Sequence, residues 1–101
     1  MTDRLTPAEI TDAAIAPWSS LADQLDATFT LPSYAAGGAF AARIAALADE
    51  QNHHPAIDLR WPGLVHVVTS SHDAGGVTAR DIRLARAITA LAHEDGATVP
   101  Q

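Results

Sequence analysis

Three histidines are the side chains of this sequence best suited to chemistry at neutral pH. His53 and His54 stand side by side before Pro55, and His72 follows eighteen residues after His54. An unperturbed imidazole titrates near pH ~6.5, so it can both give and take a proton near neutrality. Imidazoles gathered around one small molecule can therefore serve as general acid and general base. The histidines thus indicate a proton-transfer site.

Each histidine also has a plainer interpretation. A single histidine at a helix end usually interacts with the helix dipole and the last carbonyl groups. Adjacent residues of a helix point about 100° apart, so such a cap uses only one of His53 and His54 well. His72 gains interest only if an antiparallel hairpin returns its strand end to the helix end that carries the pair. His66 and His93 are interpreted as structural or solvent-facing.

A long helix must position the tandem pair. Ser33 is expected to cap this helix, which runs to about Gln51. Apolar residues at three- and four-residue spacing predict its core face, formed by Tyr34, Phe40, Ile44, Leu47 and Ala48. Gly37 and Gly38 weaken the helix by about 1 kcal/mol each, but they allow close approach of another backbone. A second face consists of small residues, namely Ala35, Ala39, Ala42 and Ala46.

A hairpin must position His72. Pro62 and Gly63 predict a turn between strands at 57–61 and 64–70. Alternation in the second strand places one set of side chains on one face, namely Val65, Val67 and Thr69. A flexible loop is expected at 73–76, followed by a last amphipathic helix that ends near His93.

Asp81 lies in the first turn of that last helix. Its spacing after Thr78 is that of a capping box, which is a sufficient structural role for the carboxylate. A carboxylate held ionised at a helix N-terminus can also orient an imidazolium. The two roles are compatible.

The amino-terminal part adds a helix and two strands. Thr6, Pro7 and Glu9 predict a helix start with a capping box, and the helix is expected to run to about Ala16. Short strands are expected at 18–22 and 26–31. The order helix, strand, strand, helix, strand, strand, helix favours antiparallel pairs with helices covering one face of the sheet.

Composition excludes several classes of function. The 101 residues suit one domain, residues 1–101, and 48% hydrophobic content suits a globular chain. A net charge of −6 without a basic cluster argues against nucleic acid as a partner. There is no cysteine, and all six basic residues are arginine, which excludes thiolate and Schiff-base chemistry. Neither a membrane-length apolar segment nor an apolar leader is present, so no membrane association and a cytoplasmic location are expected.

Taken in order, these residues resemble the pterin-4a-carbinolamine dehydratases. The motif positions that carry the resemblance are Asp49, His53, His54, Pro55, Trp61, His72 and Asp81. Three departures from the family pattern stand out: one residue inserted between Trp61 and His72, Ile57 in place of an aromatic residue, and Asp49 in place of the usual glutamate. The likeness covers about residues 5–92.

The resemblance implies both a fold and an activity. The implied fold is α+β: a four-stranded antiparallel sheet with three helices packed on one face, in the order α-β-β-α-β-β-α. The implied reaction is dehydration of 4a-hydroxytetrahydropterin to quinonoid dihydropterin, a hydro-lyase step in tetrahydropterin recycling. It needs neither a metal nor another cofactor, and its small-molecule partner is the pterin. The resemblance also implies a homodimer or a homotetramer, the latter through the small-residue face of the long helix.

The resemblance further implies which residues act. The implied catalytic set is His53, His54, His72 and Asp81, with His53 and His72 as acid–base candidates and His54 mainly orienting the pterin. Asp81 and Asp49 would tune or anchor this set. The remaining substrate-binding residues implied in this way are Asn52, Trp18, Trp61 and Ser71.

Two alternatives come from other classes of protein. Three histidines with an acidic residue could bind zinc, although chelation by adjacent histidines is geometrically awkward and the spacing matches no metal motif. The same fold could also serve only as a dimerisation or assembly partner of another protein, without catalysis. Metal analysis and histidine variants separate these cases from a dehydratase.

Overall fold

Alternating side chains build the two central strands of the sheet. In the computed structural model, which describes residues 3–98, strand β2 (Gln24–Thr30) buries Leu25, Ala27 and Phe29. Strand β4 (Leu64–Thr69) buries the alternate set that the sequence predicts, namely Val65, Val67 and Thr69. A period of two therefore gives each strand one face toward the core.

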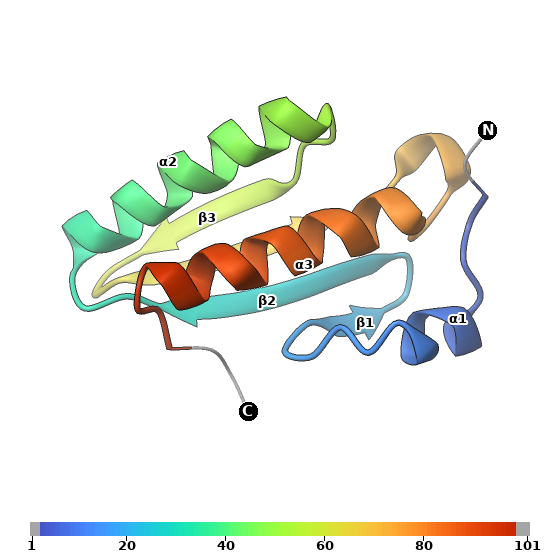
Figure 1. The fold of residues 1–101 in the computed structure, drawn as a ribbon, viewed down its shortest axis with the longest axis horizontal. Coiled ribbons are helices and arrows are strands. Elements are labelled where there is room, and N and C mark those ends of the chain that lie inside the picture. The colour runs from blue at the N-terminus through green and yellow to red at the C-terminus, as the bar shows by residue number, and fades with distance from the viewer. Residues whose placement is uncertain (1–2, 99–101) are drawn as a thin grey trace.

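Four antiparallel strands form the sheet, in the order β1-β2-β4-β3 (Figure 1). The edge strands are β1 (Ser19–Leu21) and β3 (Ala56–Arg60). The helices are α1 (Pro7–Asp12), α2 (Tyr34–Gln51) and α3 (Ala79–Glu94), and a short 3-10 helix, η1 (His72–Ala74), precedes α3. This arrangement confirms the expected fold class and element order.

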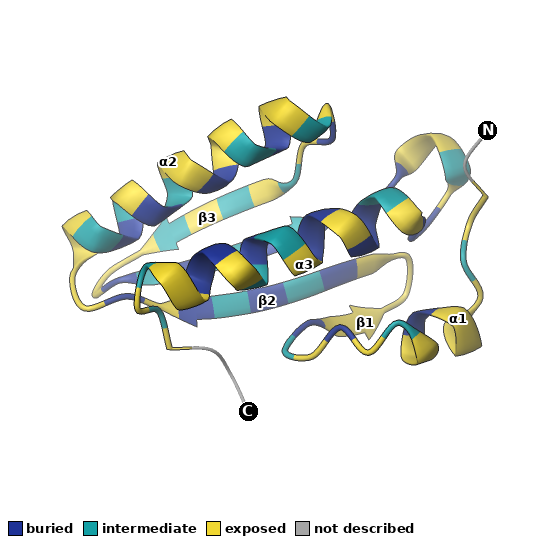
Figure 2. Cartoon of the chain, viewed as in Figure 1, coloured by how far each residue is buried: buried dark blue, intermediate teal, exposed yellow. Residues whose placement is uncertain are grey.

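Helices α2 and α3 lie side by side across one face of the sheet, and α1 lies beside β1 (Figure 1). The buried residues of both long helices face the sheet (Figure 2). Phe29 contacts Phe40 of α2, with ring centroids 5.5 Å apart in an edge-to-face arrangement. In the described part of the chain, no helix is long and apolar enough to cross a membrane.

Close backbone approach fixes α2 against the β3–β4 hairpin. A Cβ atom on Gly37 would lie 2.7 Å from Leu59 Cδ1, and one on Gly63 would lie 2.7 Å from the Ser33 carbonyl oxygen. Only glycine fits at both points without movement of a neighbour. The close approach that Gly37 permits is therefore used within the chain, where it packs the first turn of α2 against the turn between β3 and β4.

Three local expectations were wrong. Helix α1 ends at Asp12 rather than Ala16, because Ala14 adopts a left-handed φ of 50°. Tyr34 is 50% exposed rather than part of the core face, since Gly37 takes the buried position of the first turn of α2. The loop expected at 73–76 instead begins within the 3-10 turn of η1.

Candidate active site

The end of α2 separates the two adjacent histidines. Asn52 is the C-cap, with left-handed φ and ψ angles of 52° and 42°, and the His53 amide donates to the Ala48 carbonyl at 3.1 Å. Asparagine is among the few non-glycine residues that accept this conformation readily. His53 is consequently only 8% exposed, whereas the His54 side chain is 61% exposed. Asn52, expected to bind substrate, thus has a clear backbone role.

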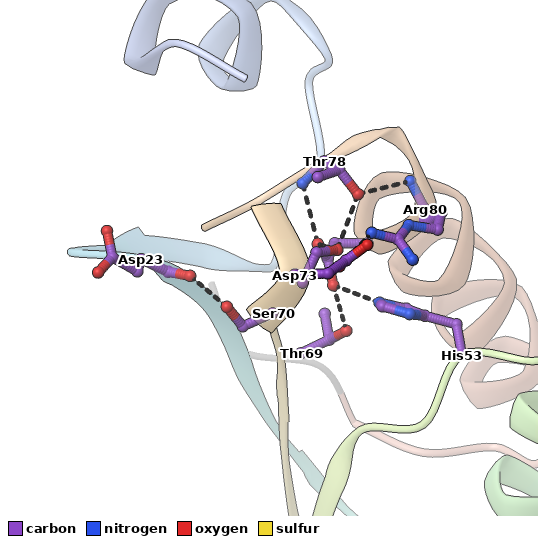
Figure 3. Close-up of polar contacts among 9 residues, drawn as sticks. Asp23, His53, Thr69, Ser70, Asp73, Thr78 and Arg80 are labelled. Carbon is purple, nitrogen blue, oxygen red and sulfur yellow. Dashed lines mark hydrogen bonds and ion pairs between the residues drawn. The ribbon is translucent and has the colours of Figure 1, made fainter. Parts of the chain in front are cut away.

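His53 is hydrogen-bonded to a buried carboxylate. Its Nε2 atom lies 2.7 Å from Oδ1 of Asp81, which is fully buried. Figure 3 draws this contact as a dashed line from the His53 ring. The Thr69 hydroxyl donates to the same oxygen at 2.6 Å. The other oxygen, Oδ2, accepts from the Ser71 hydroxyl at 2.7 Å and from the Thr78 amide at 2.9 Å. Asp81 therefore stands at the centre of a cluster of four partners.

The partners of Asp81 come from three separate parts of the chain. Thr69 ends β4, Ser71 precedes η1, Thr78 is the N-cap of α3, and His53 follows α2. Asp81 also completes the capping box that the sequence predicts, so its two expected roles coexist. One carboxylate thus joins the end of α2, the end of β4 and the start of α3.

Hydrogen bonding keeps Asp81 ionised in spite of its burial. Burial alone would raise the pKa of the Asp81 carboxyl group. Donation from His53, Thr69, Ser71 and the Thr78 amide outweighs burial and leaves this pKa below its usual value. At neutral pH the carboxylate is therefore an acceptor only.

The depressed pKa of Asp81 makes a prediction for acid unfolding. The ionised form stabilises the fold, so its contribution should be fully present above the unfolded-state pKa of 3.8 and should be lost as the pH falls through the lower folded-state pKa. We expect the free energy of unfolding to drop steeply below about pH 4. Urea denaturation measured from neutral pH to about pH 2 tests this. A curve that stays flat over that range would contradict it.

The other two site histidines are exposed beside the cluster. His72 is the first residue of η1 and directly follows Ser71. The turn is held by backbone pairing of Ser71 with Gly76, and Arg80 donates to Asp73 at 2.6 Å. His54 Nε2 lies 2.9 Å from Asp49 Oδ1 in an exposed pair.

The two tryptophans lie apart from this cluster within the chain. Trp18 is buried and donates from Nε1 to the Thr89 hydroxyl at 2.9 Å. Thr89 lies eight residues beyond Asp81 on α3, which corresponds to about 12 Å along the helix. Trp61 is 80% exposed in the β3–β4 turn, at the opposite end of β3 from His53 and His54.

Two members of the cluster had no predicted role in the site. The sequence does mark Thr69 as unusual, because it is a polar residue on the strand face otherwise made of Val65 and Val67 and therefore needs a hydrogen-bond partner. Thr78 was assigned only as part of a helix cap, and its contact with Ser71 required the folded chain. His66, interpreted as structural or solvent-facing, lies 3.1 Å from Asp26 across β2 and β4.

Two further features bear on what the site could hold. Among residues 3–98, no group of three or more potential metal-ligating side chains is arranged around one point. Five cavities of about 290–370 Å³ are lined by other residues than His53, His54 and His72; one lies between α3 and the residues that flank α1, against Leu5 and Ile82. None of these five cavities lies at the three histidines.

Comparison with known proteins places the chain in a family. Residues 3–91 match the family model described as pterin 4 alpha carbinolamine dehydratase. A protein of Natronomonas pharaonis, provisionally named pterin-4-alpha-carbinolamine dehydratase, is 41% identical over 93 residues, which cover 92% of this chain and 100% of that protein. A similarly named protein of Halobacterium salinarum is 43% identical over 86 residues, 85% of this chain and 93% of its own.

A solved structure is similar as well. The crystal structure of a transcriptional coactivator/pterin dehydratase from Brucella melitensis superimposes with a TM-score of 0.82. It is 29% identical in sequence, and the match covers 89% of this chain and 99% of that one.

Proposed function

The chain belongs to the pterin 4 alpha carbinolamine dehydratase family, and from this premise we propose that it converts a 4a-hydroxytetrahydropterin to quinonoid dihydropterin and water. The observation that carries the proposal is the hydrogen bond of 2.7 Å between His53 and the buried, ionised Asp81. It supplies an imidazole of fixed orientation beside two exposed histidines.

The reaction needs two proton transfers. A carbinolamine carries a hydroxyl group and a ring nitrogen on the same carbon. The nitrogen lone pair expels the hydroxyl group once an acid has protonated it, and water leaves as the carbon–oxygen bond breaks. The resulting cation then gives up a ring N–H proton to a base. Positioned side chains typically contribute about 10²–10⁴-fold to each such step.

The positions of the histidines suit a division of these roles. We assign His53 and His72 as the acid–base residues, because they approach from different elements that Ser71 and Asp81 tie together. His54, which is exposed and paired with Asp49, orients the pterin. These assignments follow the family motif residue by residue.

A turnover assay tests the proposed activity. Synthetic carbinolamine would be supplied from about pH 5 to about pH 9, where imidazoles titrate. We expect wild-type turnover well above the spontaneous rate and a loss of about 10²–10⁴-fold in His72→Ala. His66→Ala is the matched control, because His66 pairs with Asp26 away from the cluster. Wild-type turnover at the spontaneous rate, or equal losses in both variants, would overturn the proposal.

A second candidate function is that of an assembly partner without catalysis. The coactivator part of the name of the Brucella melitensis protein favours it, and so does the exposed small-residue face of α2, formed by Ala35, Ala39, Ala42 and Ala46. The same face supports a homodimer or homotetramer. If His53→Ala and His72→Ala left turnover unchanged while a partner protein still bound, this second function would replace the enzymatic one.

A further inference from the structure

The position of every proton around Asp81 follows from counting donors. An ionised carboxylate only accepts hydrogen bonds, at about four lone-pair sites. The Thr78 amide and the Ser71 hydroxyl donate to Oδ2, and the Thr69 hydroxyl donates to Oδ1. The remaining partner, His53 Nε2, lies 2.7 Å from Oδ1 and must donate as well. All four sites of the carboxylate are then filled.

The hydroxyl groups form a chain that can run in one direction only. Ser71 has a single hydroxyl proton and gives it to Asp81, so in the 2.8 Å contact with Thr78 its oxygen must accept. The Thr78 hydroxyl therefore donates to Ser71 and accepts from the Arg80 amide at 3.2 Å. A backbone amide cannot reverse its role. The chain thus begins at a fixed donor and ends at Asp81.

Thr69 and Ser71 are placed for this task by the pleat of the strand end. They are two residues apart, so their side chains point to the same side, and each is only 1% exposed. Ser70 lies between them, points away from His53, and donates to the Asp23 carbonyl at 2.6 Å (Figure 3). The same strand end therefore offers two hydroxyl groups on Asp81 and one that serves as a control.

We propose that Thr69 and Ser71 are positioning residues, because their hydroxyl groups keep both oxygens of Asp81 as hydrogen-bond acceptors. Neutral His53 is then held as the Nε2–H tautomer. Its other ring nitrogen, Nδ1, exchanges protons with the substrate. The catalytic half of this inference rests on the proposed function. The tautomer half rests on the hydrogen bonds alone. Asp81 has no free lone pair and does not itself take a proton from substrate.

Ring-nitrogen NMR tests the tautomer without reference to activity. Long-range ¹H–¹⁵N correlation spectra of the ¹⁵N-labelled wild-type chain distinguish protonated from unprotonated imidazole nitrogens. Near pH ~8, where imidazoles are neutral, we expect the His53 proton on Nε2. A proton on Nδ1 would overturn the inference even if the chain were an active dehydratase. The Nε2–H tautomer in a chain without turnover would support this half and overturn the proposed function.

Variants at the strand end test the positioning role. Thr69→Val and Ser71→Ala each remove one donor to a charged acceptor, and we expect each to lower kcat about tenfold with KM changed less than about twofold. Thr69→Ser and Ser71→Thr retain the hydroxyl group and should restore most of kcat. Ser70→Ala should leave both constants within about twofold of wild type, because its hydroxyl does not contact Asp81.

Two results from these variants would overturn the positioning role. One is a loss in Ser70→Ala equal to that in Thr69→Val. The other is a failure of the conservative variants to restore kcat while their melting temperatures match that of wild type.

Discussion

Replacing Asp81 by asparagine is expected to invert the tautomer of His53 and to lower turnover about 10⁴-fold, as the loss of an aspartate that orients a catalytic imidazole does elsewhere. The Thr78 amide can only donate, so it selects the amide oxygen of the new side chain at the Oδ2 position. The amide nitrogen then faces His53 Nε2, which must accept. The proton moves to Nδ1, and the basic nitrogen proposed to face the substrate is lost.

This prediction separates charge from shape, because asparagine and aspartate are nearly isosteric. Turnover and ring-nitrogen NMR of Asp81→Asn measure its two parts. Asp26→Asn is the matched control, since Asp26 also pairs with a histidine, His66, but on the two central strands away from the cluster. We expect the control to retain turnover within about twofold of wild type. A His53 proton that stays on Nε2 in Asp81→Asn, with turnover reduced less than about tenfold, would refute the mechanism.

Replacing His53 by glutamine should abolish most turnover while keeping the fold. A glutamine amide can still donate to Asp81, so the buried carboxylate keeps its four donors. It has no nitrogen that titrates near neutral pH, and the loss expected for a missing acid–base group is about 10²–10⁴-fold. His53→Ala would lose the same function and also leave Asp81 one donor short, at a cost of about 1–3 kcal/mol in the free energy of unfolding.

Urea denaturation together with turnover measurements checks this difference. His53→Gln should unfold close to wild type and His53→Ala clearly earlier, with both nearly inactive. His66→Gln, away from the cluster, should match wild type in both properties. The assignment of His53 as an acid–base residue fails if His53→Gln retains more than about half of wild-type turnover.

Local signals predicted much of the fold. Helix α2 ends at Gln51 as expected, and the predicted cap at Ser33 acts through the neighbouring Ala36 amide. The alternation in β4 predicted its buried face, because successive side chains of a strand point to opposite faces of the sheet. The early end of α1 could not be read from the pattern, since Ala14 carries no turn signal and adopts its left-handed conformation where the chain passes into the core at Ile15.

Part of the cluster around Asp81 could be predicted from the sequence, whereas the arrangement of its members could not. The motif singled out His53 and Asp81, which are 28 residues apart in the sequence, and the structure joins them directly. The sequence could not show that Thr69 and Thr78 would complete the cluster, because their contacts depend on how β4 meets α3. Nor could it show that Trp18 would bond to Thr89 in the core, since that contact spans 71 residues.

The most direct test of the whole account is a titration of the ¹⁵N-labelled chain with a 7,8-dihydropterin, followed through its five histidine side chains. The account predicts that the ring signals of His53, His54 and His72 shift together and saturate at one ligand concentration, while those of His66 and His93 stay in place. Signals of His53 and His72 that do not move, or shifts confined to His66 and His93, would contradict it.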